Sequence, residues 1–184
     1  MSSDTALVPS TYSLTTVGSY GFAQNPQSTD WYFPTNMNQH STAAVAKITI
    51  TANGVDNIYI DAYQKSEYNY DYGLISNDGS TLSTTAAADS SGVKTNLKGN
   101  TGSAVLTTNF GVLSAGTHTI YIKYFKDGSQ HSNGDYCQFA VRLNSTAFAA
   151  PSAPVSSYYV SYYDTDTYRF NHYDSGWYVS TNRF

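Results

Sequence analysis

Apolar and polar residues alternate most regularly in two runs between residues 113 and 143. In the first run Ile120, Ile122 and Tyr124 share one face of an extended chain, and in the second run Cys137 and Phe139 begin a similar face that continues at 141 and 143. A period of two is typical of half-buried β-strands. The connection KDGSQHSNGD is rich in turn-forming residues. The pattern therefore predicts a long β-hairpin near the middle of a sandwich.

The same alternation predicts further strands over residues 12–17, 44–52, 57–63, 70–74 and 104–110. For two of them, the predicted inward positions are Ala46, Ile48, Ile50, Ala52, Ile58, Ile60 and Ala62. Residues 80–103 are small and polar, and predict a long loop with one edge strand. Short strands separated by turn signals favour an all-β fold, an antiparallel β-sandwich of the jelly-roll or immunoglobulin-like kind.

The chain divides into four predicted segments. Residues 1–42 form an extended N-terminal arm, and residues 43–145 form the β-sandwich domain. Residues 146–157 contain two prolines and predict a linker, and residues 158–184 predict a small tyrosine-rich β-meander. Aromatic residues are enriched at protein interfaces, so we expect contacts through the arm and the meander. The predicted interface residues are Trp31, Tyr32, Phe33, Tyr159, Tyr163 and Trp177.

The composition supports an all-β fold and argues against two classes of partner. The 184 residues include 18 Tyr, only 12% are charged, and Glu67 is the single glutamate, so helix formers are scarce. The net charge is −4 with no basic run, and nucleic acid binding normally requires clustered Lys and Arg. No segment approaches the roughly 18 consecutive apolar residues of a membrane helix. We expect neither nucleic acid nor membrane as a partner.

The single cysteine bears on where the chain folds. Cys137 has no second cysteine to pair with, and its apolar neighbours predict a small core residue. The N-terminal sequence MSSDTALVPS lacks the basic start and apolar centre of a secretory signal peptide. We therefore expect synthesis and folding in a reducing cytosol.

Paired carboxylates are the first candidates for catalysis. Glu67 and Asp71 lie around a tyrosine-rich turn, and Asp164 and Asp166 bracket Thr165. A glycosidase needs two carboxylates across a cleft, whereas aspartates in turns usually serve the backbone. No GxSxG-like motif supports a serine nucleophile. We expect solvated turn residues and no catalytic site, and a polysaccharide-degrading enzyme is the least favoured of the functions considered.

Metal binding has only weak sequence support. Calcium sites use carboxylate, amide and carbonyl oxygens, and the loops contain aspartates without the spacing of a known calcium loop. These candidates are Asp56, Asp78, Asp89, Asp127 and Asp135. The histidines have no zinc-ligand spacing; they are His40, His118, His131 and His172. We expect no metal and no cofactor.

Tyrosines crowd one strand and its loop beside an amide and a carboxylate. Sugar-binding sites use this mixture, because aromatic faces stack on C–H surfaces while Asp and Asn bond hydroxyls. The candidate glycan-binding residues are Tyr63, Tyr68, Asn69, Tyr70, Asp71 and Tyr72. The alternative is a packed tyrosine-rich sheet face or a subunit interface.

Three segments carry a family resemblance: YDYGLISNDGSTLST at 70–84, VKTNLKG at 93–99 and LSAGTHTIYIKYFKDGS at 113–129, followed by GDYCQFAVRL. Together they resemble a β-sandwich domain of structural proteins of tailed bacteriophages, with crAss-like gut phages nearest. The text around AGTHTI is also similar to carbohydrate-binding modules. The resemblance covers residues 43 to 145 and implies a virion component: a tail, fibre, collar or head-decoration protein.

Two functional hypotheses follow. The first is a non-enzymatic virion protein, made in the bacterial cytoplasm, that forms a homo-oligomer and contacts other virion proteins through its arm or its aromatic C-terminal tail. The second is a carbohydrate-binding module that contacts host-surface glycans.

Overall fold

The fold comes from a computed structural model in which residues 7–99, 104–129 and 134–154 are described. These residues form ten β-strands and no helix. The strands are β1 (Thr11–Thr16), β2 (Phe22–Asn25), β3 (Ser28–Pro34), β4 (Thr42–Ala52), β5 (Asn57–Lys65), β6 (Tyr72–Ser76), β7 (Val93–Lys98), β8 (Leu106–Val112), β9 (Gly116–Lys126) and β10 (Tyr136–Leu143). No helix in the described ranges has the length and hydropathy needed to cross a membrane.

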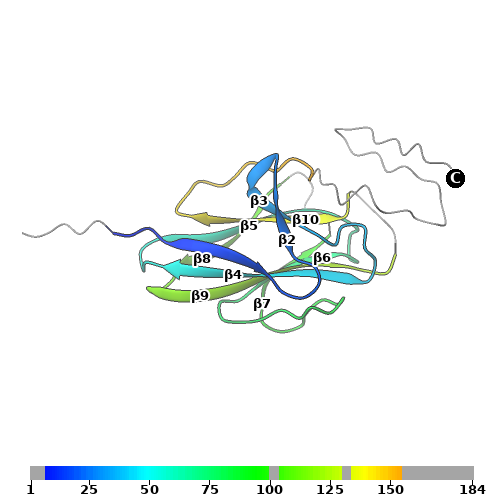
Figure 1. The fold of residues 1–184 in the computed structure, drawn as a ribbon, viewed down its shortest axis with the longest axis horizontal. Coiled ribbons are helices and arrows are strands. Elements are labelled where there is room, and N and C mark those ends of the chain that lie inside the picture. The colour runs from blue at the N-terminus through cyan, green and yellow to red at the C-terminus, as the bar shows by residue number, and fades with distance from the viewer. Residues whose placement is uncertain (1–6, 100–103, 130–133, 155–184) are drawn as a thin grey trace, which may run out of the picture.

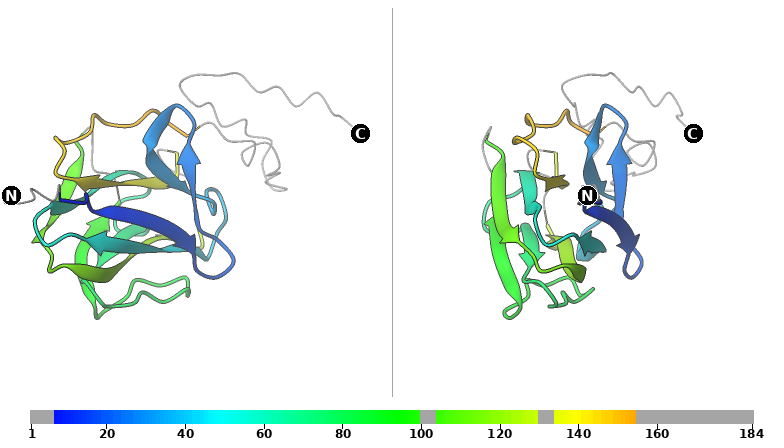
Figure 2. Two further views of the ribbon diagram at one scale, coloured as in Figure 1. Left: turned by 60° about the vertical axis from the view of Figure 1, so that its left-hand side comes forward. Right: turned by 90° about the vertical axis from the view of Figure 1, so that its left-hand side faces the viewer.

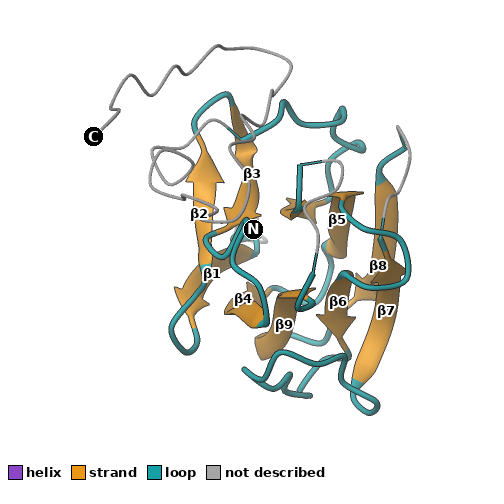
Figure 3. Cartoon of the chain, turned by 90° about the vertical axis from the view of Figure 1, so that its right-hand side faces the viewer, coloured by secondary structure: helices purple, strands orange, loops and turns teal. Residues whose placement is uncertain are grey.

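Two five-stranded antiparallel sheets lie one over the other (Figure 1). The first sheet has the order β1-β4-β9-β6-β7, and the second has the order β2-β3-β10-β5-β8. The strands β7 and β8 lie side by side at one lateral edge (Figure 3), where Thr95 and Thr108 share a hydrogen bond of 2.7 Å between their hydroxyls. The predicted all-β sandwich is confirmed, and β7 is an edge strand within the predicted loop 80–103.

The strand order identifies the kind of sandwich. Among the eight strands β3 to β10, the ladders join the first to the last, the second to the seventh, the third to the sixth and the fourth to the fifth. A long antiparallel hairpin rolled over a core gives this pattern, which is the jelly roll. Strand β1 extends the first sheet beside β4, and strand β2 extends the second sheet beside β3.

The predicted hairpin between residues 113 and 143 is wrong. Strand β9 pairs with β4 and β6, whereas β10 pairs with β3 and β5 in the other sheet. Each is the central strand of its sheet. The alternation reports which face of a strand is buried, and it does not report the pairing partner. In a rolled hairpin, most strands that follow each other along the chain belong to opposite sheets.

The core lies between the two sheets, and the inward positions are confirmed. All seven predicted inward residues of β4 and β5 are buried, as are Ile120, Ile122, Tyr124, Cys137 and Phe139. Leu143 is partly buried against the same cluster. Burying one such aliphatic or aromatic side chain contributes about 1.5–3 kcal/mol. The apolar alternation is therefore sufficient to position β4, β5, β9 and β10 around one core.

Residues 11–34 differ from the extended arm expected of residues 1–42. They supply β1 to the first sheet and β2 and β3 to the second, and Phe22 packs in the core. Trp31 and Phe33, both predicted at an interface, are only 2% exposed and pack within the chain, while Tyr32 is partly buried against the core. The large aromatic side chains are buried here because β3 is covered on both faces.

Residues 145–154, expected in part as a linker, cover the outer face of the second sheet; Figure 2 shows this segment in orange. Phe148 contacts Trp31 edge-to-face with ring centroids 6.4 Å apart. The carbonyl of Ser152 accepts hydrogen bonds from Asn25 at 2.9 Å and Gln138 at 3.0 Å. This cover forms a second apolar cluster that leaves β10 buried on both faces. The predicted meander at 158–184, with Tyr159, Tyr163 and Trp177, lies outside the described residues.

Candidate binding site at one end of the sandwich

Three loops meet at the end of the sandwich where the candidate tyrosines lie. The amide of Ser41, in the β3–β4 loop, donates to the carbonyl of Asp127 at 2.7 Å. The amide of Asp127, after β9, donates to Asp71 Oδ1 in the β5–β6 loop at 3.0 Å. The end of β7 joins them, since the amide of Asn69 donates to the carbonyl of Lys98 at 3.4 Å. The loops therefore support one another.

Only part of the predicted glycan site lies on the surface. Tyr68 is 65% exposed and Tyr70 is 56% exposed, and Asn69 between them has a φ of 66°. Tyr72 stacks on Phe125 with ring centroids 6.0 Å apart and donates its hydroxyl to the carbonyl of Asn69 at 2.8 Å. The loop thus presents two neighbouring aromatic side chains from a fixed backbone turn.

Two of the predicted residues lie inside the protein. Tyr63 is buried in the second apolar cluster, with Lys65 Nζ 5.4 Å from its ring centroid. Asp71 is fully buried. These two side chains therefore cannot contact a ligand on the surface, and the tyrosine-rich sequence is partly a packed sheet face, as the alternative interpretation states.

The buried Asp71 belongs to a charged cluster. Its Oδ2 lies 3.7 Å from Lys126 Nζ, and the same Nζ lies 3.0 Å from Asp135 Oδ2. Asp71 also accepts from the Glu67 amide at 3.1 Å and from the Tyr124 hydroxyl at 3.5 Å. The side chains of Asp71, Lys126 and Asp135 are all 0% exposed.

Burial has the largest effect on the pKa values of Asp71 and Tyr124. It raises the pKa of Asp71 to about 6, although the positive charge of Lys126 and the Asp127 amide act in the opposite direction, and the negative charge of Asp135 adds to the rise. Burial also raises the pKa of the Tyr124 phenol well above its ordinary value. Removing a charged group from water favours its neutral form. Asp71 is thus a carboxyl group that holds a proton at mildly acidic pH.

The turn-rich connection predicted from the sequence includes Lys126 and Asp135, yet the sequence also contains a signal for their burial. Lys126 continues the inward positions of β9 in steps of two from Tyr124, and Asp135 continues those of β10 from Cys137. Asp71 lies four residues before Ile75 of β6, two steps of two along the same inward face. Period-two counting carried past the apolar residues would have placed all three charged side chains inside.

The remaining aspartates considered for calcium have protein partners. Asp78 Oδ2 lies 2.6 Å from His118 Nδ1, and Asp89 Oδ2 lies 2.7 Å from Lys123 Nζ. Asp56 accepts from Ser10, Asn53 and Asn144, and these bonds lower its pKa. Asp127 accepts from Ser129. In the described parts of the chain, no three His, Cys, Asp or Glu side chains are grouped to hold a metal ion.

The carboxylate pair Glu67 and Asp71 lacks the arrangement of a glycosidase. Asp71 is enclosed and bonded to the protein, so it cannot act across a cleft on a substrate. It is also not the solvated turn residue that the sequence predicts. Asp164 and Asp166, the other pair, lie outside the described residues, as does His131.

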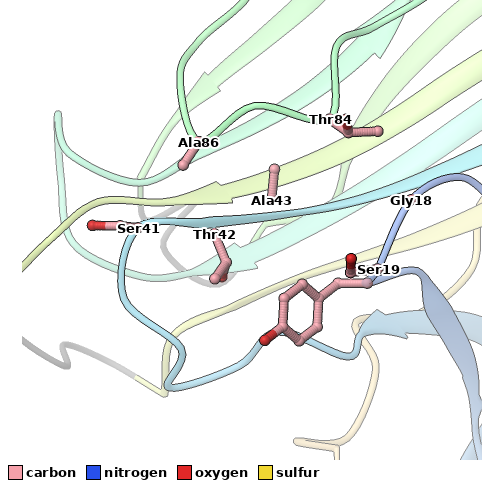
Figure 4. A pocket seen from close by; sticks show the side chains of 8 residues that line it. Gly18, Ser19, Ser41, Thr42, Ala43, Thr84 and Ala86 are labelled. Atoms are coloured by element: carbon pink, nitrogen blue, oxygen red, sulfur yellow. The ribbon is translucent and has the colours of Figure 1, made fainter.

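An open hollow lies where the β1–β2 loop, the start of β4 and the loop 77–92 meet (Figure 4). Its volume is about 220 Å³. The hydroxyl-bearing residues that line it are Ser19, Tyr20, Ser41, Thr42 and Thr84. Gly18 has a φ of 87°, and a Cβ there would lie 2.9 Å from Thr84 Cγ2, so glycine lets the two loops approach. The lining offers hydrogen bonds but no group for acid–base catalysis near neutral pH.

Neither a family model nor a curated protein matches this chain. Two exposed tyrosines on a supported loop, and a hydroxyl-lined hollow, suit recognition of a surface or of a sugar. At the loop end, Asp71, Lys126 and Asp135 are held in internal contacts.

Proposed function

We propose that this chain is a non-enzymatic structural component of a tailed-phage virion that assembles with copies of itself. The observation that carries the proposal is the jelly-roll strand order, because viral capsid proteins and lectins reuse this architecture. This support is a fold-level analogy. The sequence resemblance to phage structural proteins over residues 43 to 145 adds to it. The enclosed carboxylates at the loop end argue against catalysis.

The surface proposed for assembly is the edge of β1 that pairs with no other strand of the described residues. This strand, TYSLTT, contains no charge and no proline, and its Ser13 and Thr15 side chains are exposed. Edge strands without charge or proline can pair with another chain. The adjoining Val8 is 76% exposed and adds apolar area. An antiparallel pair of β1 strands from two copies would join two sheets around a twofold axis.

The test is the molar mass in solution, measured by size-exclusion chromatography with light scattering. The full chain is expected to be an oligomer, and the double variant Ser13→Lys/Thr15→Lys is expected to dissociate, because like charges on a paired edge repel. The matched control places the same two charges in the loop 77–92, as Thr81→Lys/Ser90→Lys, and should leave the mass unchanged. A full chain that stays monomeric at high concentration contradicts the proposal. Removing residues 158–184 shows whether the C-terminal segment carries the contact instead.

A second candidate function, carbohydrate binding, is favoured by the exposed pair Tyr68 and Tyr70. Replacing both with alanine is expected to weaken binding of a cell-surface polysaccharide about tenfold, because each ring stacking contact contributes about 0.5–1.5 kcal/mol. The stability should be unchanged, since both side chains lie outside the core. Val112→Ala, at a residue 52% exposed, is the control. Equal binding by the double variant and the parent chain would remove the tyrosines from the site.

A further inference from the structure

Lys126 and Asp135 connect the central strands of the two sheets. Lys126 is the last residue of β9, and Asp135 directly precedes β10. Their side chains point inward from opposite sheets and bring Nζ and Oδ2 to 3.0 Å. A second carboxyl group, that of Asp71, lies 3.7 Å from the same Nζ. The cluster thus contains one amine, one carboxyl group in contact with it and one additional carboxyl group, all enclosed.

The surroundings of this cluster favour neutral groups. Charges are costly to hold in a site without water, and a proton transferred from an ammonium to a carboxylate removes two charges at once. Asp71 Oδ2 lies 3.7 Å from Nζ and can take this proton from Lys126 and pass it to Asp135, and burial raises the pKa of Asp71 to about 6. Tyr124, also fully buried, donates its hydroxyl to Asp71 Oδ2 and adds no charge of its own. Once the proton has moved, the Lys126 amine and the Asp135 carboxyl group, which lie 3.0 Å apart, are the reactant pair of an amide condensation.

We propose that Lys126 and Asp135 condense spontaneously to an isopeptide bond. The Lys126 amine attacks Cγ of Asp135 and forms the Nζ–Cγ bond. The bond from Cγ to one carboxyl oxygen then breaks, and this oxygen leaves as water with a proton that Asp71 relays from the amine. One amine and one carboxylic acid become one amide and one water, and Asp71 ends as it began. No oxidant or cofactor is needed. The fold holds the Lys126 amine against the Asp135 carboxyl group, and this proximity favours the reaction.

Lys123 provides an internal comparison on the same strand. Its Nζ lies 2.7 Å from Asp89 Oδ2 and also donates to Ser83 Oγ at 3.1 Å and to the Ala87 carbonyl at 2.6 Å. Burial acts to raise the pKa of Asp89, but bonds from Lys123 and Ser83 outweigh it and hold that pKa below its ordinary value. The described residues place no second carboxyl group at this lysine. Lys123 and Asp89 therefore remain an ion pair.

The bond would tie the two sheets together covalently. The chain has one cysteine and cannot do this with an intrachain disulfide. The cross-link would close the β9–β10 connection where the chain passes from one sheet to the other. The inference stands apart from the proposed function, because it needs neither a partner nor a glycan.

The experiment is the intact mass of the full chain under denaturing conditions, followed by tryptic mapping. The mass is expected to be lower than that of the sequence by one water molecule. Trypsin should cut after Lys123 but not after Lys126, so the peptide of residues 124–142 should appear whole and one water lighter. The control Lys123→Arg should show the same loss of water.

Three variants test the assignment of roles. Asp135→Ala should restore the full mass. Asp135→Asn should still form the bond with loss of ammonia, so its final mass should coincide with that of the parent chain. Asp71→Asn should slow or abolish the loss of water, although both atoms of the proposed bond, Lys126 Nζ and Asp135 Cγ, are still present.

The outcomes that overturn the inference are equally defined. A parent chain with the full mass of its sequence refutes the bond, whether or not any variant folds. A loss of water that maps to Asp127 and Gly128, with normal cleavage after Lys126, indicates a succinimide at that Asp-Gly pair and also refutes it.

Discussion

Replacing Asp61 with alanine is expected to lower the free energy of unfolding by about 3–5 kcal/mol, because it leaves a buried guanidinium without its counter-charge. Asp61 on β5 is fully buried, and its Oδ2 accepts from Arg142 Nε at 2.6 Å. Its Oδ1 accepts from Arg142 Nη2 at 3.1 Å and from the Thr107 hydroxyl at 2.6 Å. Arg142 also lies 4.4 Å from the ring centroid of Tyr59. This network joins β10, β5 and β8, so its loss should weaken the whole second sheet.

Chemical denaturation measures this effect. Asp30→Ala, at an exposed position on β3, is the control and should change stability by no more than about 0.5 kcal/mol. The double variant Asp61→Leu/Arg142→Met should recover much of the loss, because removing both charges also removes their desolvation cost. A loss below about 1 kcal/mol for Asp61→Ala would show that water reaches the guanidinium.

The apolar positions of the core follow from the sequence because they obey one local rule. Ile48 and Ile60 recur at every second residue of their strands, and burial of one face follows from that alone. The partner of each strand obeys no local rule. In the jelly roll β9 pairs with β4, and every pair of residues in this ladder is more than 60 residues apart along the chain, so turn signals between neighbouring runs mislead.

Polar residues on the outer faces of the sheets do not follow this rule. Arg142 and Gln138 alternate with core residues, which predicts exposure, yet both are buried because residues 145–154 cover that face. Lys123 is buried for the same reason on the other sheet, where the loop 77–92 covers it. Neither covering segment alternates apolar and polar residues with a regular period, so the rule that places the strands does not place these segments.

The candidate site could be predicted in part. Tyr68 and Tyr70 lie in a loop rich in turn-forming residues, and exposure is expected of large side chains there. Burial of Asp71 and its contact with Lys126 needed both the phase of three strands and the way their ends converge. The alternation of inward and outward positions along each strand can be read from the sequence. The meeting of the three strand ends follows only from the fold.

Phe22→Ala is expected to lower the free energy of unfolding of the sandwich by about 3–5 kcal/mol, with one cooperative transition. Phe22 lies within residues 1–42, which the sequence assigns to an arm, and an arm could lose a side chain without effect on the core. In the structure Phe22 is 7% exposed and meets Phe139 of β10 edge-to-face, with ring centroids 5.5 Å apart.

Denaturant unfolding followed by fluorescence and by circular dichroism tests this directly. Gln27→Ala, at an exposed position in the same N-terminal region, is the control and should be nearly neutral. Phe139→Ala should cost a similar amount, and the double variant should cost less than the sum, because each ring forms part of the other's cavity. Two separate transitions, or a loss for Phe22→Ala as small as that of the control, would mean that β2 and β3 fold apart from the jelly roll. A single transition at lower denaturant would show that the N-terminal strands belong to the same cooperative unit as the central strand β10.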